Sequence, residues 1–345
     1  MEFALARYRL RFKHPFGTAH GLRDGTDSVF VRIRRKGFVG YGEATLPPYL
    51  NETQDSVHEE LECFWLKFGR ELDPAVGPWP FNDPISAPAR AAIRVAHRML
   101  IANELSGSSE SGSRVDVRGS TGTCMVTLGH TDVNRIALKL SELPAAPILK
   151  VKLGAANDLE FLRAISQMDA RKFFLDANQG WTSVDQALAA IEVVGVERVL
   201  GLEQPFAKDR WDLHEALAKE CPVTVYGDES IQGPDDLERA PEAFGGVNLK
   251  LMKCGGLDVA EAMAERARGL GLKVMLGSMS ESTLGCGAMA SLQHLADLAD
   301  LDGPWLISND PFEGLEMHHG RLVMDGIERI RLKEPSLLDF SPIGA

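Results

Sequence analysis

The residues best suited to chemistry are three carboxylates at a regular spacing. They are Asp176 in FFLDANQGW, Glu203 in VLGLEQPF and Asp228 in VTVYGDES, at intervals of 27 and 25 residues. This spacing is the length of one strand-plus-helix unit, and each carboxylate follows a short apolar run. Parallel neighbouring strands would bring the three together at one end of a sheet, and oxygen ligands without Cys or His suit a hard cation such as Mg²⁺. Acidic residues also cap helices, but three carboxylates that each directly follow a strand-like run favour a metal site.

The elements that must position these carboxylates are strand-like runs that alternate with helix-like stretches such as Asp158–Met168 and Ser183–Val194. Regular alternation predicts parallel strands with right-handed crossovers, and about eight runs favour a closed TIM-like barrel of the (β/α)7β type over an open sheet. Chemistry in such barrels takes place at the carboxyl ends of the strands, where all three carboxylates fall. The runs are Thr123–Thr127, Ile148–Leu153, Phe173–Asp176, Val199–Glu203, Val223–Tyr226, Val247–Leu251, Lys273–Leu276 and roughly Asp300–Ile307.

The first third of the chain has a different pattern, which predicts a separate α+β domain over residues 1–114. Alternating apolar residues around Tyr8 and Val31 predict an antiparallel meander. Two helices should follow, the first with Thr53 as its N-cap and the second over about Ala87–Leu105.

A linker and a C-terminal segment complete the predicted organisation. SGSSESGS, residues 106–113, is typical of a flexible joint. The barrel would then span residues 115–315. Residues 316–345, with a short hairpin near Gly320–Val323, would return to the first domain.

Lysines in the second and sixth runs are candidate acids and bases. Lys150 and Lys152 in ILKVK share one face of a strand. Both should point into the barrel, where mutual repulsion and partial burial lower a lysine pKa and make a neutral amine available near neutral pH. Lys250 ends the sixth run and would face Lys152 across the barrel mouth. Lys253 has the opposite parity, and we expect it in a loop or at a helix start.

These lysines fit one type of reaction well. A substrate carboxylate would bind the metal ion, which stabilises an enediolate. One lysine would remove the proton α to that carboxylate, and the opposite lysine would return a proton to the other face of the carbon. The α-carbon would thereby be inverted.

The chain resembles the enolase superfamily, specifically its muconate-lactonizing-enzyme subgroup. The matching pieces, in order, are GYGEA (residues 40–44), KVK, LDANQGW, LEQP, GDES and NLKLMKCGG. The resemblance covers nearly the whole chain and implies that residues 1–114 form the N-terminal capping domain. It also implies Mg²⁺ as cofactor, as in enolase-superfamily sites in general. The implied Mg²⁺ ligands are Asp176, Glu203 and Asp228, with Lys152 and Lys250 as the acid/base pair and Lys150 supporting Lys152.

Two features narrow the resemblance. No His lies close after the seventh run, unlike in the mandelate-racemase and sugar-acid dehydratase groups. Asp300 and Asp302 in ADLDGPWL lie two residues apart, and such a like-charged pair aimed at a pocket needs a cation. They resemble the DxD motif with which dipeptide epimerases hold the substrate's α-ammonium group. A solvated turn is the alternative interpretation, whereas an EF-hand would need further acidic positions.

The predicted function is therefore a Mg²⁺-dependent dipeptide epimerase that inverts the C-terminal residue of an L-Ala-Xaa dipeptide by two-lysine 1,1-proton transfer. The nearest rival is a lyase or cycloisomerase of the same subgroup, such as o-succinylbenzoate synthase or muconate cycloisomerase, which needs no ammonium clamp. A rival from another class is a non-catalytic metal-binding barrel. Buried lysines are costly to keep without a role, which argues against it.

The identity of Xaa stays open at this point. If Arg23 reaches the pocket, an acidic Xaa is favoured by a charge-assisted pair. If aromatic and apolar residues dominate, a hydrophobic Xaa is favoured. Arginines are ordinarily exposed to solvent, so we expect Arg23 to stay outside the pocket and slightly prefer a hydrophobic Xaa. The residues expected to read Xaa are Phe16, His20, Arg23, Tyr49, Met279 and Ser280, with Glu281 beside them.

Composition excludes other classes of function. The net charge of −12 argues against sequence-independent binding to nucleic acid. Five dispersed cysteines without a CxxC pair predict reduced thiols in a cytoplasmic protein. The N-terminus lacks a signal-peptide core, and charges interrupt every long apolar stretch, so no membrane partner is expected. A homo-oligomer is compatible with the sequence but not indicated by it.

Overall fold

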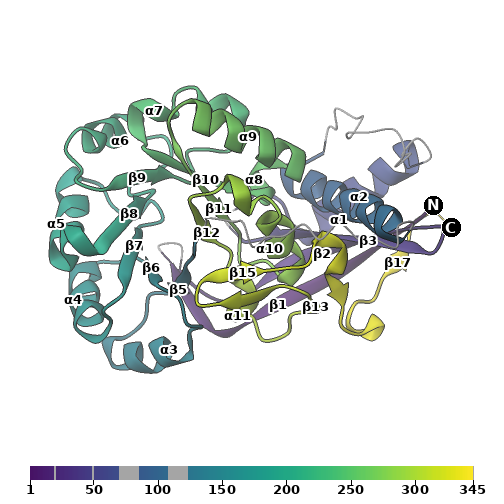
Figure 1. Ribbon diagram of the computed structural model, residues 1–345, viewed down its shortest axis with the longest axis horizontal. Helices are drawn as coiled ribbons and strands as arrows, with labels where there is room; N and C mark the ends of the chain where they lie inside the picture. The colour runs from purple at the N-terminus through teal and green to yellow at the C-terminus, as the bar shows by residue number, and fades with distance from the viewer. Residues whose placement is uncertain (19–20, 49, 70–84, 108–122, 345) are drawn as a thin grey trace.

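The computed structural model describes residues 1–18, 21–48, 50–69, 85–107 and 123–344 of the 345-residue chain. Figure 1 shows an antiparallel sheet with its helices beside a ring of parallel strands that is surrounded by helices. Of the predicted linker, only Ser106 and Gly107 are described, and they end a helix. The rest of the linker lies outside the described residues, as do His20 and Tyr49.

The antiparallel sheet has the strand order β17-β1-β2-β3. Its strands are β1 (Glu2–Thr18), β2 (Gly21–Arg35), β3 (Phe38–Leu46) and β17 (Ser341–Pro342). The first three form the predicted meander. Ser341 of β17 pairs with Leu5 of β1, so the end of the chain adds a strand to this sheet.

Two helices belong to this domain, α1 (Gln54–Phe68) and α2 (Ala87–Gly107). The Thr53 side chain caps α1 by accepting a hydrogen bond from the Ser56 N–H at 3.1 Å, as predicted. Helix α2 runs two residues beyond its predicted end and packs closely on β3. At Gly40 and Gly42, a Cβ would lie only 1.9 and 1.8 Å from backbone oxygens of α2, which explains the glycines of the GYGEA motif.

The second body is a closed barrel in which all strand pairs are parallel. Its first strand is split at Met125, whose N–H donates to Ala299 O at 2.8 Å. The two halves pair with the last and the second strand, which closes the ring. The strands are β4 (Thr123–Cys124), β5 (Val126–Leu128), β6 (Ile148–Lys152), β7 (Lys172–Asp176), β8 (Val199–Glu203), β9 (Thr224–Gly227), β10 (Gly246–Lys250), β11 (Lys273–Gly277) and β12 (Leu298–Asp300).

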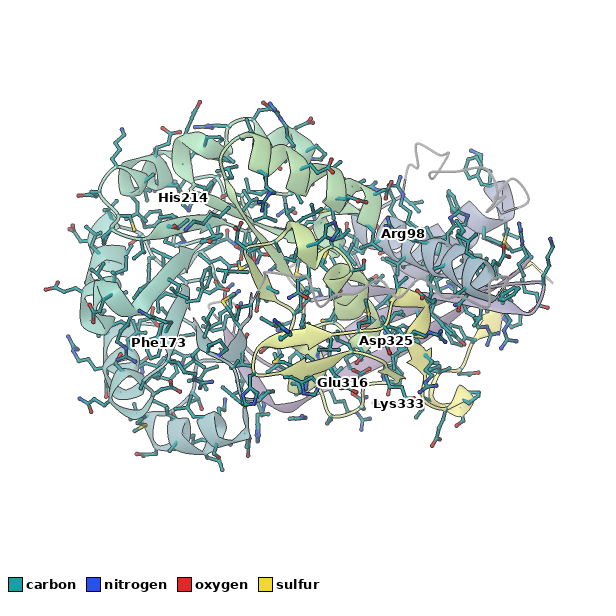
Figure 2. All side chains as sticks on the ribbon, viewed as in Figure 1. Arg98, Phe173, His214, Glu316, Asp325 and Lys333 are labelled. Carbon is teal, nitrogen blue, oxygen red and sulfur yellow. The ribbon has the colours of Figure 1, made fainter. Side chains whose placement is uncertain are left out.

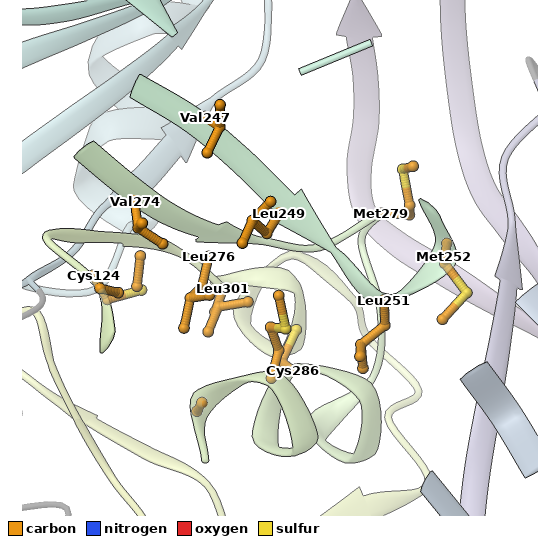
Figure 3. Close-up of a cluster of buried hydrophobic side chains, with 14 of the residues drawn as sticks. Cys124, Val247, Leu249, Leu251, Met252, Val274, Leu276, Met279, Cys286 and Leu301 are labelled. Atoms are coloured by element: carbon orange, nitrogen blue, oxygen red, sulfur yellow. The ribbon is translucent and has the colours of Figure 1, made fainter. Parts of the chain in front are cut away.

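Helices follow the barrel strands and surround the ring, as the alternation predicted (Figure 1). They are α3 (Ile136–Glu142), α4 (Asp158–Met168), α5 (Val184–Val194), α6 (Trp211–Ala218), α7 (Ala240–Ala243), α8 (Leu251–Cys254), α9 (Leu257–Gly269), α10 (Thr283–Ala290) and α11 (Gly303–Leu306). Figure 3 shows part of the apolar layer between the strands and the helices: Val247 and Leu249 of β10, Val274 and Leu276 of β11 and Cys286 of α10 belong to one buried cluster.

One predicted strand is misplaced. The run Asp300–Ile307 was expected to form the last barrel strand, but β12 ends at Asp300 and α11 occupies most of the remainder. The reason is Pro304, which lies in the first turn of α11, where the missing N–H costs nothing. Asp302 consequently sits in a strand-to-helix turn and not on a strand face.

Aromatic rings fill the barrel interior beneath its carboxyl end. Phe174 and Tyr226 contact each other with centroids 5.2 Å apart, among Met125, Ile148 and Met275. Glycines on neighbouring strands make room for these rings. A Cβ on Gly201, for example, would lie 2.6 Å from the Phe174 ring. The interior is therefore packed, and only its upper layer can carry a site.

The C-terminal segment lies alongside the barrel and the sheet, and Figure 2 labels Glu316, Asp325 and Lys333 on it. It contains the strands β13 (Phe312–Glu313), β14 (Glu316–His318), β15 (Arg321–Val323) and β16 (Arg331–Leu332). The predicted hairpin is β14–β15, and Gly320 O accepts a hydrogen bond from the Cys124 N–H, so this hairpin packs on the barrel. Among the described residues, no helix is both long and apolar enough to cross a membrane.

Candidate active site

The three regularly spaced carboxylates lie on consecutive barrel strands at their carboxyl ends. Asp176 ends β7 and Glu203 ends β8, and the two residues are paired in the sheet register. Asp228 follows β9 directly. All three side chains are buried, with at most 3% exposure. Asn248 of β10 donates to Glu203 Oε1 at 2.7 Å and fixes the orientation of that carboxylate.

Lys150 is the hub that links these carboxylates. Its fully buried Nζ lies 2.9 Å from Asp176 Oδ2, 2.6 Å from Glu203 Oε2 and 2.5 Å from Asp300 Oδ2. Burial opposes the charged form, but these carboxylates outweigh it and raise the pKa of Lys150 well above its ordinary value. The predicted lowering of a lysine pKa is therefore wrong for Lys150, because the sequence did not reveal how many carboxylates surround it.

Lys152 and Lys250 come from strands on opposite sides of the ring. β6 and β10 are separated by three strands in one direction around the barrel. Lys152 Nζ lies 2.6 Å from Asp176 Oδ2, and Lys250 Nζ lies 2.6 Å from Asp228 Oδ2. Each lysine thus contacts a different member of the carboxylate trio, and both line the same cavity.

Lys253 is a site residue whose importance the sequence understated. It does lie in a helix start, α8, as expected, but its side chain is buried. Its Nζ donates to Asp228 Oδ1 at 2.6 Å, Asp228 O at 2.7 Å and Asn248 O at 2.8 Å. Burial is outweighed by Lys250 and Lys253, which hold the pKa of Asp228 well below its usual range.

Charge is unevenly balanced at this end of the barrel. Six carboxylates, Asp176, Glu203, Asp228, Glu229, Asp300 and Asp302, meet four lysines, Lys150, Lys152, Lys250 and Lys253. If all ten groups were ionised, they would carry an excess of two negative charges, which the raised pKa values of Glu203, Glu229 and Asp302 reduce when no cation is bound. The donor atoms that the trio offers are all oxygen. This chemistry fits a divalent hard cation such as Mg²⁺.

The carboxylates do not, however, stand as a finished metal cage. Within the described residues, no three His, Cys, Asp or Glu side chains are arranged to hold a metal ion, because ammonium groups lie between them. The pKa values reflect this crowding. Burial and the Asp176 charge raise the pKa of Glu203 to about 8, whereas Lys150 and Lys152 overcome burial and lower the pKa of Asp176 to about 2. A cation shared by the trio would relieve the repulsion at Glu203.

Asp300 and Asp302 meet at one wall of the cavity together with Thr127 of β5. The Thr127 N–H donates to Asp302 Oδ2 at 2.6 Å, and its hydroxyl donates to Asp302 Oδ1 at 3.1 Å and Asp300 Oδ1 at 3.4 Å. Burial and the Asp300 charge raise the pKa of Asp302 to about 7. Both carboxylates are nearly fully buried, so the alternative of a solvated turn is excluded.

The cavity between the two domains has a volume of about 360 Å³. Arg23, Met279 and Ser280 line it, and the role in reading Xaa that the sequence predicts for them stays a prediction. Arg23 is partly buried, with its guanidinium carbon 5.6 Å from the Phe12 ring centroid, so the assumption of an exposed arginine is wrong. Phe16 lies on β1, and nothing is described of its side chain. His20 and Tyr49 are outside the described residues.

Several strand ends adopt backbone conformations that are rare outside glycine. Asn178, Gln179, Gln204 and Ser280 have φ values of 45°, 67°, 37° and 66°. Such residues cluster at functional sites, where the surroundings hold them in place. The Gln204 side chain is one such restraint, since its Oε1 accepts from the Asp228 and Ser230 N–H groups.

Sequence reasoning missed Thr127, Asn248 and Glu229 in addition to Lys253. Asn248 has the same strand parity as Lys250, so it could have been assigned to the barrel interior. Glu229 adjoins Asp228, and burial together with the Asp228 charge raises its pKa to about 7. Nothing in the sequence marked Thr127 as a site residue, because threonine is common in strands.

Comparisons with known proteins agree with this geometry. The enolase C-terminal domain-like family model matches residues 138–325. The L-Ala-D/L-Glu epimerase of Bacteroides thetaiotaomicron is 33% identical over 336 residues, covering 96% of this chain and 87% of that protein.

Two solved structures share the fold over almost their whole length. One is an enolase family member from Agrobacterium tumefaciens with homology to dipeptide epimerases, with bound sodium and L-Ala-L-Glu. Its TM-score is 0.80 at 26% identity, with 98% of this chain and 99% of that chain covered. The other is the dipeptide epimerase of Methylococcus capsulatus complexed with Mg and L-Arg-D-Lys. Its TM-score is 0.76 at 28% identity, with 94% and 97% covered. The chain therefore belongs to the enolase superfamily and is an isomerase.

Proposed function

We propose that this chain is a Mg²⁺-dependent dipeptide epimerase that inverts the α-carbon of the C-terminal residue in an L-Ala-Xaa dipeptide. The observation that carries the proposal is the placement of Lys152 and Lys250 on opposite strands of one ring, each hydrogen-bonded to a different carboxylate of the trio. Names of relatives support the substrate class, since the Bacteroides protein is an L-Ala-D/L-Glu epimerase.

Asp176, Glu203 and Asp228 would hold the metal ion. When bound, Mg²⁺ would supply positive charge to the enediolate oxygens. Asn248 keeps Glu203 oriented, and Lys253 keeps Asp228 oriented, through the hydrogen bonds described above. These buried partners reduce the reorganisation that the carboxylates undergo when a cation arrives.

The proton transfers would be made by the two opposed lysines. One of them, as a neutral amine, accepts the α-hydrogen as a proton, and the C–H bonding pair moves into the carboxylate to give an enediolate. The other, as an ammonium, donates a proton to the opposite face and re-forms the C–H bond with inverted configuration. The reverse reaction exchanges the two roles. Lys150, whose raised pKa keeps it charged, serves as a fixed positive charge beside Lys152.

Asp300 and Asp302 would bind the α-ammonium group of the dipeptide, in a buried environment where charge-assisted hydrogen bonds are strong. This clamp separates the proposal from its rivals. A muconate cycloisomerase or o-succinylbenzoate synthase acts on substrates without an amine. A non-catalytic barrel would have no use for opposed lysines or for an amine clamp.

Arg23 favours an acidic Xaa. It lines the cavity and is partly buried, which reverses the slight preference for an apolar Xaa drawn from the sequence. Its guanidinium can make a bidentate pair with a side-chain carboxylate. Met279 and Ser280 on the same cavity would contact the rest of the side chain.

A dipeptide library in D₂O with Mg²⁺ tests the function directly. We expect mass spectrometry to detect uptake of one α-deuterium in dipeptides with an acidic C-terminal residue. Arg23→Met should remove the preference for acidic over apolar Xaa while keeping exchange. Absence of exchange in every dipeptide, or exchange confined to compounds without a free amine, contradicts the proposal.

Asp302→Asn tests the amine clamp. We expect kcat/KM for free dipeptides to fall about 30-fold or more, because a buried charge pair is lost. For N-acetylated dipeptides, which bring no ammonium group, kcat/KM should change little. The exposed Asp209→Asn variant serves as the matched control. An unchanged ratio between free and acetylated substrates would show that Asp302 does not bind the amine.

A further inference from the structure

A short barrel loop forms one wall of the cavity and is held by two buried carboxylates from different domains. The loop follows β11 and runs from Ser278 to Ser282, with Met279 and Ser280 on the cavity. Ser280 has φ 66°, so the loop needs outside restraint to keep this shape. Its restraints come from Glu43 on β3 and from Glu281 within the loop.

Glu43 reaches the loop from the GYGEA motif of β3 and is 1% exposed. The Ser282 N–H and hydroxyl donate to it at 3.0 and 2.5 Å, and the Gly285 N–H donates at 3.1 Å. The Thr45 hydroxyl adds a fourth donor at 2.7 Å. Four donors from two domains suit an ionised carboxylate, which can only accept hydrogen bonds.

Glu281 has a contrasting environment, although it is also fully buried. Its Oε1 accepts from the Met279 N–H at 3.0 Å, whereas its Oε2 has no hydrogen-bond partner among the described residues. Gly285 lies between the two carboxylates: its N–H donates to Glu43, and a Cβ on it would come within 2.3 Å of Glu281 Oε2. An alanine at 285 would therefore displace Glu281.

The charged and titratable groups around the pair define its protonation. Glu281 faces Glu43 from β3, Lys250 at the end of β10, and Cys286 of α10, whose Sγ donates to Glu281 O. Asp310, which caps α10 through Thr283, adds negative charge near Glu43. Burial raises the pKa of Glu43 as well, but hydrogen bonds from Ser282 and Thr45 oppose that shift. Burial and the Glu43 charge raise the pKa of Glu281 to about 8, and Glu281 accepts only one hydrogen bond, so Glu281 is the carboxyl that carries the proton near neutral pH.

We propose that an ionised Glu43 and a protonated Glu281 are positioning residues at the seam between the two domains and together hold the Met279–Ser280 wall in its binding shape. Loss of that proton places two negative charges in a buried site, and repulsion between them loosens the wall. The effect on substrate binding rests on the proposed function, because it requires that substrate touches this wall. The effect on the loop itself does not.

Glu281→Gln tests the inference, because the amide keeps the size of the side chain and cannot lose a proton. The exposed Glu265→Gln variant controls for the change in charge. Thermal unfolding and amide hydrogen exchange of residues 278–282 are measured from pH 6 to 10 without substrate, and KM is measured over the same range. Folding raises the pKa of Glu281. The stability that Glu281 contributes is therefore complete at pH values below the pKa that it has in the unfolded chain, and it is lost as the pH rises through about 8.

We therefore expect Glu281→Gln to have a higher Tm than wild type. The difference between the two Tm values should grow as the pH rises to 8 and stay constant above pH 8. Above pH 8 the wild-type loop should exchange faster than the variant loop. KM should rise about five-fold in wild type while that rise is absent in the variant. If Glu281→Gln does not fold, the wild-type protein alone provides the test. Amide hydrogen exchange of residues 278–282 is then compared with that of β12 at pH 7 and at pH 9, and only the loop should exchange faster at the higher pH.

Each contrary result has a distinct meaning. Parallel Tm and exchange curves for wild type and Glu281→Gln would overturn the protonation of Glu281. Divergent stability curves with superimposed KM profiles would overturn the positioning role. A wild-type protein without epimerase activity would refute the proposed function, and the exchange measurement would still decide whether the loop responds to pH.

Discussion

Replacing Lys152 or Lys250 by alanine is expected to abolish epimerisation while leaving one half of the reaction in each variant. Each lysine serves one face of the α-carbon, so Lys152→Ala should still exchange the α-hydrogen of one diastereomer with solvent, and Lys250→Ala that of the other. We expect epimerisation to fall by about 10³-fold or more, within the range for the loss of a general acid or base. Deuterium uptake from D₂O, measured separately for L,L and L,D dipeptides by NMR, distinguishes the two faces.

Lys208→Ala is the matched control, since Lys208 also lines the cavity but is exposed, and its hydrogen bonds with Gln179 and Ser230 are made by its backbone N–H and carbonyl. Its turnover should stay close to that of wild type. If both lysine variants lose exchange from the same diastereomer, the lysines serve one face. If either variant epimerises like wild type, the two-base mechanism is wrong.

Glu203→Gln is expected to weaken Mg²⁺ binding by about 100-fold or more and to reduce turnover at least as strongly, because one anionic ligand is lost. The metal-free variant should nevertheless unfold at the same temperature as wild type or higher. The amide can still accept from Asn248, and it removes a buried carboxylate crowded by Asp176. Calorimetric titration with Mg²⁺, electron paramagnetic resonance with Mn²⁺ and thermal unfolding in EDTA measure these effects separately.

The exposed Glu192→Gln variant on α5 controls for the loss of one negative charge. Unchanged metal affinity in Glu203→Gln would remove Glu203 from the ligand set. A large drop in the Tm of the metal-free variant would show instead that Glu203 has mainly a structural role as the partner of Lys150.

Much of this arrangement could be predicted because it follows from periodicity. Alternation in ILKVK placed Lys150 and Lys152 inside the barrel and the apolar residues outside, where Leu149 and Val151 do pack against helices. The spacing of Asp176, Glu203 and Asp228 matched consecutive strand-plus-helix units, so the same edge of the barrel was implied. These inferences need only the strand repeat and the direction of the chain.

What could not be predicted depends on contacts between distant segments. The burial of Lys253 on Asp228 results from the turn into α8, and the left-handed residue Ser280 lies in a loop whose Ser282 donates to Glu43 of β3. Pro304 redirected the chain after Asp300 into a helix, although its apolar neighbours resembled a strand. In each case tertiary contacts outweighed the local pattern that the sequence displays.

A crystal structure of the Mg²⁺ complex with a bound dipeptide tests the central claim most directly. We expect Asp176, Glu203 and Asp228 to coordinate one ion at about 2.1 Å, with the Nζ atoms of Lys152 and Lys250 about 3 to 3.5 Å from the α-carbon on opposite faces. Both Nζ atoms on the same face, or an ion bound without these three carboxylates, would contradict the account.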